Sequence, residues 1–360
     1  MFNKNNVFRN TTLFILLLIS CLAMSCTTNS EGDNQLNLEG QWKLQALDNI
    51  EINNINATEE PLLISTNSGI YVNVKGDLIE FGLQGEPIVN VIQIAENEYI
   101  AAIKTLQLEG GDTTLYKTNN NGEQWAPHMG SFGGEENKYT RISDLQIKAP
   151  GSSTFYACGG GNIARTTDGG SLWNSVHLTW EHLGFALFVK PDPNDSDVIW
   201  AGGANAKFQP KLIRSSNRGD SWEYLSVLEG IDANVNDLFK DNSNSEKLII
   251  GLSGNIPAAN IIRRSEDNGE TWETVFEGAG MYTFSQSPRN ADLVYASGRN
   301  DTGTLFFLVS NNFGDTWQTI ALEDSPGEIH VNDMVSVLEG GQEVIYLGTN
   351  KGLYSYTIEE

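Results

Sequence analysis

Basic residues are scarce in this 360-residue chain: 22 lysines and arginines stand against 46 aspartates and glutamates, and the formal net charge is −24. An acidic excess of that size repels the phosphates of nucleic acids and the head groups of anionic lipids. We therefore expect no nucleic-acid partner. The charge also keeps a large surface soluble, which is the simpler meaning of the acidity.

Histidine is rare too, and the four that occur are scattered without the spacing of a metal site. The chain lacks a phosphate-binding loop, a dinucleotide-binding glycine motif and the glycine–serine elbow of a hydrolase. We therefore expect neither a cofactor nor a metal. The segment D-P-N-D-S-D, residues 192–197, looks like a calcium loop but lacks the glycine and the distal glutamate of an EF-hand. An ordinary Pro-Asx turn between two strands explains it better, with calcium as the alternative.

Sustained apolar runs are missing except near the N-terminus, where Lys4 and Arg9 precede a short apolar stretch. That stretch is too short to span a membrane, and the pattern is typical of a signal peptide. It ends in L-A-M-S-C, which resembles a lipoprotein signal whose cysteine, Cys26, is lipidated after cleavage. Cys21 is a rival site, but a polar tether follows Cys26 at once. We expect a signal peptide over 1–25, a lipidated cysteine and tether over 26–39, and one domain over 40–360.

The residue after the lipidation site bears on the destination of the chain. Thr27 stands where an aspartate would favour inner-membrane retention in many Gram-negative bacteria, so we expect an outer-membrane lipoprotein that faces the periplasm or the cell surface. Cys158 is then the remaining cysteine of the mature chain, which precludes an intrachain disulfide. Its setting, F-Y-A-C-G-G-G, predicts a small buried strand residue rather than a nucleophile.

A repeated eight-residue segment organises the rest of the chain. The segment S-E-D-N-G-E-T-W (265–272) recurs at 310–317, 215–222 and 166–173, with a worn copy, T-N-N-N-G-E-Q-W, at 118–125. The copies lie ~45–50 residues apart, which is the spacing of units in a propeller or solenoid. The shared pattern, Ser/Thr-x-Asp/Asn-x-Gly-x-x-Trp, predicts a turn in which the hydroxyl and Asx side chains bond backbone amides and the glycine adopts a positive φ. The tryptophan should open the next strand and bury its ring.

This pattern resembles the Asp-box, or bacterial neuraminidase repeat, of sialidases, xyloglucan-cleaving glycosidases, sortilin-type receptors and photosystem II assembly factors. The resemblance is strongest over residues 115–320. It implies a β-propeller in which the repeated turns are architectural and lie away from the binding face. It identifies a fold and leaves the ligand open.

Strand patterns give each repeat four strands, and the last unit, 328–358, supplies three. The segment G-Q-W-K-L-Q-A-L, residues 40–47, can supply the fourth, which is how a propeller closes its ring. We therefore predict an all-β fold, a seven-bladed β-propeller closed by an N-terminal strand. Six or eight blades remain alternatives because the first unit lacks the repeated turn. The predicted blades are 48–84, 88–130, 141–178, 183–228, 232–277, 280–322, and 328–358 with 41–47.

True sialidase activity is not expected. Sialidases hold the substrate carboxylate with three arginines, one of them in an Arg-Ile-Pro motif that is missing here. Arg165, Arg214 and Arg264 each lie three residues before the Asx of a repeated turn. Residues that recur at one repeat position sit in different blades with one orientation, which suggests a scaffold role.

Three aspartates recur near the start of a blade's first strand: Asp144 in I-S-D-L, Asp237 in V-N-D-L and Asp333 in V-N-D-M. Because innermost strands line the channel of a propeller, these carboxyls can meet there as the acid/base pair of a glycoside hydrolase or bind a cation. A recurring aspartate can instead cap the strand by bonding backbone amides. The recurrence favours capping, and asparagine should then be tolerated similarly at all three positions.

The face opposite the repeated turns is the better candidate for ligand binding. Its loops carry aromatic and charged residues of the kind that a carbohydrate or peptide surface needs. The candidates are Tyr139, Arg141, Trp180, Glu181, His182, Lys207, Arg299 and His330, with Phe208, Met281 and Tyr282 near them.

These features favour a non-enzymatic binding or assembly module for a glycan or protein partner, anchored to the outer membrane through Cys26. The alternative is a carboxylate-dependent glycoside hydrolase with its site at the central channel. The sequence gives no indication of oligomeric state.

Overall fold

Short strands separated by glycine-, asparagine- and aspartate-rich turns form antiparallel four-stranded sheets, and a computed structural model shows how these sheets are arranged. The predicted signal peptide, Cys26 and the tether lie outside the residues that the structure describes. Every described residue belongs to the compact unit Leu38–Glu360. The described residues are 42–57, 61–74, 76–104, 115–129, 142–148, 151–178, 182–244, 246–300, 305–320 and 329–358.

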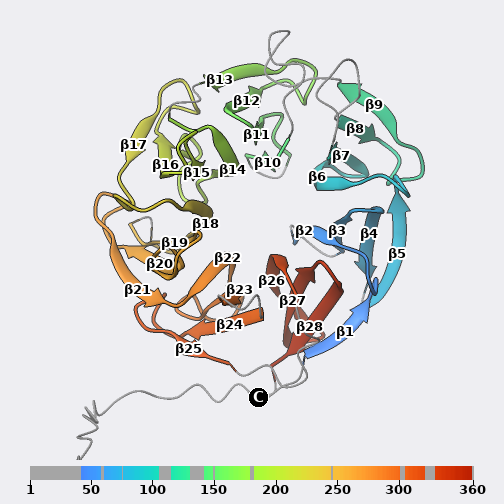
Figure 1. The fold of residues 1–360 in the computed structure, drawn as a ribbon. Helices are drawn as coiled ribbons and strands as arrows, with labels where there is room; N and C mark the ends of the chain where they lie inside the picture. The colour runs from blue at the N-terminus through green and yellow to red at the C-terminus, as the bar shows by residue number, and fades with distance from the viewer. Residues whose placement is uncertain are drawn as a thin grey trace, which may run out of the picture. The chain divides into compact units, whose positions relative to one another are not determined.

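Seven four-stranded blades are arranged in a ring in the described part of the chain (Figure 1). In each blade the first strand is innermost and the strands follow one another outward. The first four blades are β2 (Ile52–Asn56), β3 (Leu62–Thr66), β4 (Gly69–Val74) and β5 (Asp77–Gly82); β6 (Ile88–Ala95), β7 (Glu98–Ile103), β8 (Leu115–Thr118) and β9 (Ala126–Met129); β10 (Asp144–Ile147), β11 (Phe155–Gly159), β12 (Asn162–Thr166) and β13 (Asn174–Leu178); and β14 (Phe185–Pro191), β15 (Ile199–Ala204), β16 (Pro210–Ser215) and β17 (Glu223–Leu225).

Blade 7 combines the two ends of the described chain, as the sequence predicts. Strand β1 pairs antiparallel with β28, and Trp42 lies opposite Tyr356 in that pairing. The seven-bladed prediction is thus confirmed, and the six- and eight-bladed alternatives are wrong. The last three blades are β18 (Asn234–Lys240), β19 (Leu248–Ser253), β20 (Ile261–Ser265) and β21 (Glu273–Glu277); β22 (Ala279–Gln286), β23 (Val294–Asn300), β24 (Leu305–Ser310) and β25 (Gln318–Thr319); and β26 (Val331–Glu339), β27 (Gln342–Thr349), β28 (Gly352–Thr357) and β1 (Trp42–Ala46).

The hydrophobic core lies between neighbouring blades. Second strands such as β11, β15 and β3 are buried along their whole length, which explains why their sequences are largely apolar. Their side chains meet those of the next blade. One buried cluster, for example, joins Trp200 of blade 4 to Val235 of β18 and Ile250 of β19 in blade 5.

The approach of neighbouring blades depends on glycine at two buried positions. A Cβ atom on Gly251 of β19 would lie 2.7 Å from the Met281 carbonyl oxygen of blade 6. A Cβ atom on Gly348 of β27 would lie 2.7 Å from a methyl carbon of Ile52 in blade 1. Glycine is therefore needed there so that one blade can pack directly on the next.

Cys158 lies in β11 and is free and fully buried. Burial, followed by the negative charge of Asp144, raises the pKa of its thiol well above the ordinary value. The thiol therefore stays protonated at neutral pH, and the prediction of a small buried strand residue is confirmed.

The five repeated turns have one hydrogen-bonding pattern, which follows from their shared residues. In the copy that begins at Ser265, the Ser265 hydroxyl donates to Oδ1 of Asp267 (2.8 Å) and accepts from the Gly269 N–H (2.8 Å). The Asp267 Oδ1 atom also accepts from the Thr271 N–H (2.8 Å), and Gly269 has a φ of +88°. The predicted turn geometry is therefore present, and the glycine supplies a backbone conformation that other residues rarely adopt.

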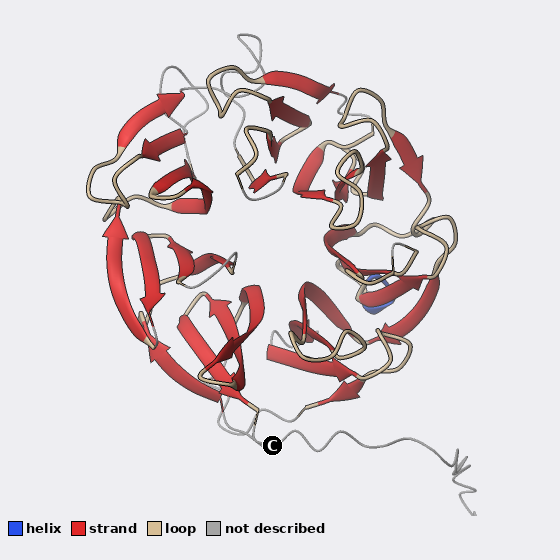
Figure 2. Cartoon of the chain, turned by 180° about the vertical axis from the view of Figure 1, so that it is seen from behind, coloured by secondary structure: helices blue, strands red, loops and turns tan. Residues whose placement is uncertain are grey.

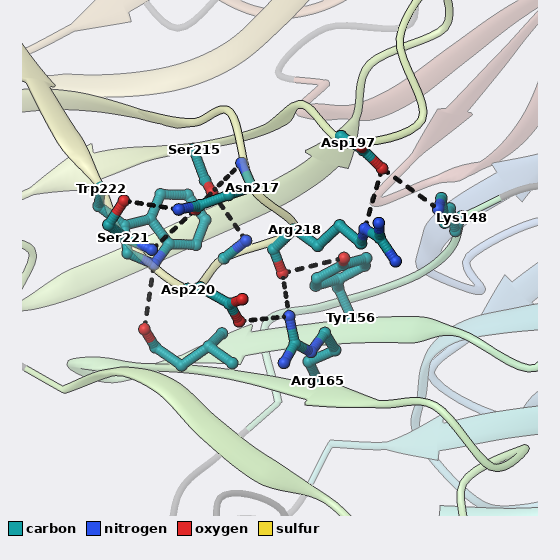
Figure 3. Close-up of polar contacts among 12 residues, drawn as sticks. Lys148, Tyr156, Arg165, Asp197, Ser215, Asn217, Arg218, Asp220, Ser221 and Trp222 are labelled. Carbon is teal, nitrogen blue, oxygen red and sulfur yellow. Dashed lines mark hydrogen bonds and ion pairs between the residues drawn. The ribbon is translucent and has the colours of Figure 1, made fainter.

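Each repeated turn also contacts a neighbouring blade, as Figure 3 shows for blade 4. Arg165 of blade 3 donates to the Arg218 carbonyl oxygen (2.7 Å) and forms an ion pair with Asp220 (2.9 Å). The Trp222 indole N–H donates back to the Val176 carbonyl oxygen of blade 3 (3.0 Å). Arg214 and Arg264 reach the turns of blades 5 and 6 in the same way. The three recurring arginines thus connect blades.

The tryptophans of these turns are less buried than the sequence suggests. Trp173 is fully buried, whereas the other four rings are partly exposed and pack against the edge of the core. The strand begins at the residue after the tryptophan in each blade, for example at Glu273 after Trp272. The four partly exposed rings therefore lie at the edge of the core, whereas Trp173 is part of it.

Helical structure is confined to a short 3-10 turn, η2 (Pro257–Ala259), within the residues described above (Figure 2). No helix in that part of the chain has the length and apolar character needed to cross a membrane.

Candidate functional site

A polar cavity of about 980 Å³ lies at the centre of the ring. Residues of all seven innermost strands line it, from β2, β6, β10, β14, β18, β22 and β26. These strands surround the centre in Figure 1. The three recurring aspartates are among the lining residues, so the expectation that they line the channel agrees with the structure.

Each recurring aspartate joins its own blade to the next one. The Asp333 Oδ1 atom accepts from the Met334 N–H (2.8 Å), and its Oδ2 atom accepts from the Ile55 N–H of blade 1 (2.8 Å). Both oxygens therefore bind backbone donors. The other two do the same: Asp237 accepts from Leu238 (2.9 Å) and from Phe284 of blade 6 (3.2 Å), and Asp144 accepts from Leu145 (2.8 Å) and from Val189 of blade 4 (3.1 Å).

The residue before the aspartate makes a second bridge between blades. The Asn236 side-chain amide donates to the Met281 carbonyl oxygen (2.8 Å), and the Asn332 amide donates to the Ile52 carbonyl oxygen (2.8 Å). In V-N-D-L and V-N-D-M the asparagine therefore binds a backbone carbonyl of the neighbouring blade, and the aspartate binds one of its backbone N–H groups. Asparagine is a poorer replacement for these aspartates than the sequence alone suggests, because its NH₂ group would face a backbone N–H.

Lys190 is a channel residue that the sequence analysis did not single out. It lies near the end of β14, and its ammonium group forms an ion pair with Asp237 and donates to the Leu238 carbonyl oxygen (3.0 Å). About a third of its side chain is exposed, 34%. The sequence feature that could have identified Lys190 is its position as the one charged residue in the otherwise apolar strand F-A-L-F-V-K-P.

The channel shifts the pKa of two of its carboxyl groups upward. Burial raises the pKa of Asp333 to about 6, with a further contribution from the negative charge of Asp237, while backbone donors and Lys190 act in the opposite direction. Burial also raises the pKa of Asp144, against hydrogen bonds from Gln146 and Val189. The protonated form of Asp333 is therefore favoured more than that of an ordinary aspartate.

Two of the predicted ligand-binding residues lie together on the face opposite the repeated turns. The Arg299 guanidinium donates from Nε to the Tyr282 hydroxyl (3.0 Å) and lies 3.2 Å from Nε2 of His330. It also stacks over the Tyr282 ring at 5.6 Å from the ring centroid. Because Tyr282 lines the cavity, this group is at the edge of the channel. Met281, expected near them at the surface, is instead fully buried in β22.

The structure does not bring the other described candidates to this place. His182 is exposed, and its ring lies 4.3 Å from that of Tyr224 in an outer strand. Lys207 is exposed in the β15–β16 loop beside Phe208. The remaining candidates, Tyr139, Arg141, Trp180 and Glu181, lie outside the described residues.

The segment at 192–197 forms a turn whose first aspartate is already paired. The Asp192 carboxylate forms a buried ion pair with Lys240 and accepts from the Trp200 indole N–H (2.9 Å). Its other oxygen accepts from the Asn194 N–H (2.9 Å), as a Pro-Asx turn requires. Among the described residues, no group of three or more histidine, cysteine, aspartate or glutamate side chains is arranged to hold a metal ion.

No protein-family model matches the sequence, and no curated protein matches it at a significant level. Solved structures match its fold. YCF48 from Cyanidioschyzon merolae has a TM-score of 0.63 at 12% identity, over 88% of this chain and 98% of that chain. The GH74 enzyme of Niastella koreensis has a TM-score of 0.64 at 15% identity, over 88% of this chain and 53% of that chain. The extracellular domain of the putative one component system BT4673 from B. thetaiotaomicron has a TM-score of 0.60 at 12% identity, over 88% of this chain and 40% of that chain.

The chain is a β-propeller. At these identities the likeness shows the fold alone, and the chain spans about half or less of the second and third of these proteins. The three neighbours have different names on one architecture, so function has to be argued from the site.

Proposed function

We propose that this propeller is a non-enzymatic binding or assembly module that takes a glycan or a protein partner at the mouth of its central channel. The proposal rests on the hydrogen bonds that the recurring aspartates make. Both oxygens of Asp144, Asp237 and Asp333 accept backbone N–H groups from two blades. Carboxylates fixed in this way stabilise the ring, and they leave an open polar cavity suited to recognition.

We further propose that the protein is attached to the outer membrane through a lipid on Cys26. Support comes from the sequence: a short apolar stretch, L-A-M-S-C, a threonine after the cysteine and a polar tether. A tethered propeller would present its channel to ligands in the periplasm or at the cell surface.

A carboxylate-dependent glycoside hydrolase is the second candidate, and one observation favours it. The pKa of Asp333 is about 6, raised by burial and by the charge of Asp237. A carboxyl group whose pKa is raised by burial is what a general acid requires. Against this assignment, Lys190 pairs with Asp237 and four donors surround Asp333.

The two candidates are separated by testing the purified full-length protein against plant and marine polysaccharides for both retention and product release. We expect retention without product release. The Asp333→Asn variant should then lose stability, by about 1–3 kcal/mol for a mismatched buried donor, in step with any loss of binding. Steady product release by the native protein, abolished in an Asp333→Asn variant that unfolds at the native temperature, would establish the hydrolase instead.

The anchor is tested by substituting the two candidate cysteines. Cys26→Ser should accumulate as an unprocessed precursor without incorporated lipid, whereas Cys21→Ser should be processed and labelled normally. Cell fractionation should place the native protein in the outer membrane. Lipid labelling that survives in Cys26→Ser and vanishes in Cys21→Ser would move the site to Cys21.

A further inference from the structure

Blade 4 lacks hydrogen-bonding side chains at the two positions that bridge neighbouring blades in blades 5 and 7. Blades 5 and 7 carry Asn-Asp there, whereas the first strand of blade 4 carries Leu187 and Phe188. Neither of these side chains can donate or accept a hydrogen bond. Lys190 instead connects blade 4 to Asp237 of blade 5. Phe188 is buried in the core cluster that joins blades 4 and 5, so the scaffold accounts for it, whereas it does not account for the exposed Leu187.

Three apolar side chains of blade 4 are exposed together, and we call them the aromatic shelf. Phe185 is 40% exposed, Leu187 is 37% exposed and Phe208 is 56% exposed. The rings of Phe185 and Phe208 stack with their centroids 5.4 Å apart and their planes 12° apart. Leu187, two residues after Phe185 on the same strand, also lines the central cavity. One member of the shelf, Leu187, therefore belongs to the lining of the channel.

The loop that carries Phe208 is held in a strained conformation. Phe208 has a φ of +59°, which a bulky side chain rarely adopts. The Asn205 Oδ1 atom accepts from the N–H groups of Lys207 (3.0 Å) and Gln209 (3.0 Å), and the Phe208 N–H donates to the Asn205 carbonyl oxygen (2.9 Å). Strain of this kind persists where the surroundings enforce it, and it gathers at ligand-binding sites.

We propose that the aromatic shelf binds the apolar face of a pyranose ring in a neutral glycan, with the sugar hydroxyls directed into the channel. This inference rests on the proposed binding function and gives it a substrate class. The C–H groups on one face of a pyranose ring complement the negative face of an aromatic ring. A flat apolar surface beside a polar cavity matches the two sides of a sugar.

The charge and hydrogen-bonding capacity of the channel select among glycans. Four aspartates and two lysines line it, and the whole chain carries −24, so an anionic polysaccharide is disfavoured. Side-chain amides that are not fully buried, such as those of Asn56, Gln146 and Asn332, also line the cavity. Amides of this kind can donate to and accept from sugar hydroxyl groups. A hydrogen-bonding lining beside the shelf therefore suits a neutral glycan.

The test uses the purified full-length protein and affinity electrophoresis in gels that contain galactomannan, mixed-linkage β-glucan or, as the anionic comparison, polygalacturonate. We expect retardation by a neutral polysaccharide and none by polygalacturonate. Phe185→Ala and Phe208→Ala should each weaken binding about fivefold to tenfold. The matched control is Leu172→Ala, which removes an exposed apolar side chain (59% exposed) from a repeated turn and should bind as the native protein does.

A glycine variant separates recognition from folding. Because glycine adopts a positive φ without strain, Phe208→Gly should unfold at or above the native temperature while it loses binding as Phe208→Ala does. Parallel loss of binding and of stability in Phe208→Gly would overturn the assignment by making the residue structural.

The remaining outcomes distinguish failure of the shelf from failure of the binding function. Neutral-glycan binding that survives in both phenylalanine variants but is lost in Tyr282→Ala would overturn the shelf and leave the proposed function standing. Binding of a protein partner alone, lost in the phenylalanine variants, would overturn the glycan assignment. Retention of neither glycan nor protein would overturn both.

Discussion

Removing either charge of the buried pair Asp192–Lys240 should lower the free energy of unfolding by about 3–5 kcal/mol. The two side chains are 0% and 4% exposed, and the Asp192 carboxylate also accepts from the Trp200 indole N–H. The Lys240 ammonium lies 5.3 Å from the centroid of the Trp200 ring. Lys240→Met therefore leaves a buried carboxylate without its counter-charge, and Asp192→Asn leaves a buried ammonium group.

Urea denaturation of the two single variants and of the double variant Asp192→Asn/Lys240→Met measures this loss. The double variant should be more stable than the sum of the single losses implies, because it buries no unpaired charge. The matched control is the partly exposed pair Lys117–Glu98, whose side chains are 31% and 37% exposed. Lys117→Met should cost less than about 1 kcal/mol. Single losses at Asp192 and Lys240 no larger than this control would contradict the prediction.

The ring and its blades follow from local patterns in the sequence. The repeated turn is encoded within eight residues, because its hydroxyl, Asx oxygen and glycine N–H bond one another. A fixed spacing of these turns then gives the blade length, and a missing strand in the last unit identifies β1 as the closing strand. Fold prediction succeeds here because each blade is specified by residues near one another in the chain.

The contacts between blades could not be predicted in the same way. Asp333 accepts an N–H from Ile55, and Lys190 pairs with Asp237, which lies 47 residues further along the chain. No local pattern specifies such partners, and the sequence therefore leaves both capping and catalysis open for the aspartates. It also places Met281 at the surface, whereas close packing against Gly251 of the preceding blade buries it.

One signal for the aromatic shelf is present in the sequence. When the first strands are aligned on their buried residues, Leu187 and Phe188 of blade 4 occupy the positions equivalent to Asn236 and Asp237 of blade 5. Phe188 serves the core between blades 4 and 5, whereas the exposed Leu187 stands where the scaffold does not require an apolar residue. What the sequence does not contain is the exposure of Phe185 and its stacking on Phe208, since both depend on how the β15–β16 loop turns back over β14.

His177 should make the propeller lose stability in mild acid. This imidazole lies in β13 between blades 3 and 4, where it is 7% exposed and its Nε2 atom is 3.2 Å from the Tyr224 hydroxyl. Burial, and then the positive charge of His182, lowers its pKa from 6.5 to about 4. The folded state therefore binds a proton less readily than the unfolded chain does. Protonation at His177 therefore leaves the free energy of unfolding unchanged above about pH 6.5 and lowers it progressively as the pH falls toward 4. The loss is about 2 kcal/mol at pH 5.

Urea denaturation of the native protein and of His177→Gln at pH 8, 6 and 5 tests this loss. Other acid-sensitive groups act equally on both proteins, so the difference in unfolding free energy between them isolates the imidazole. That difference should shift by about 2 kcal/mol in favour of the variant between pH 8 and pH 5. In His182→Gln the neighbouring charge is gone, the pKa of His177 rises toward its ordinary value, and the shift should become smaller. A difference that stays constant across this pH range would mean that His177 is protonated as readily in the folded propeller as in the unfolded chain.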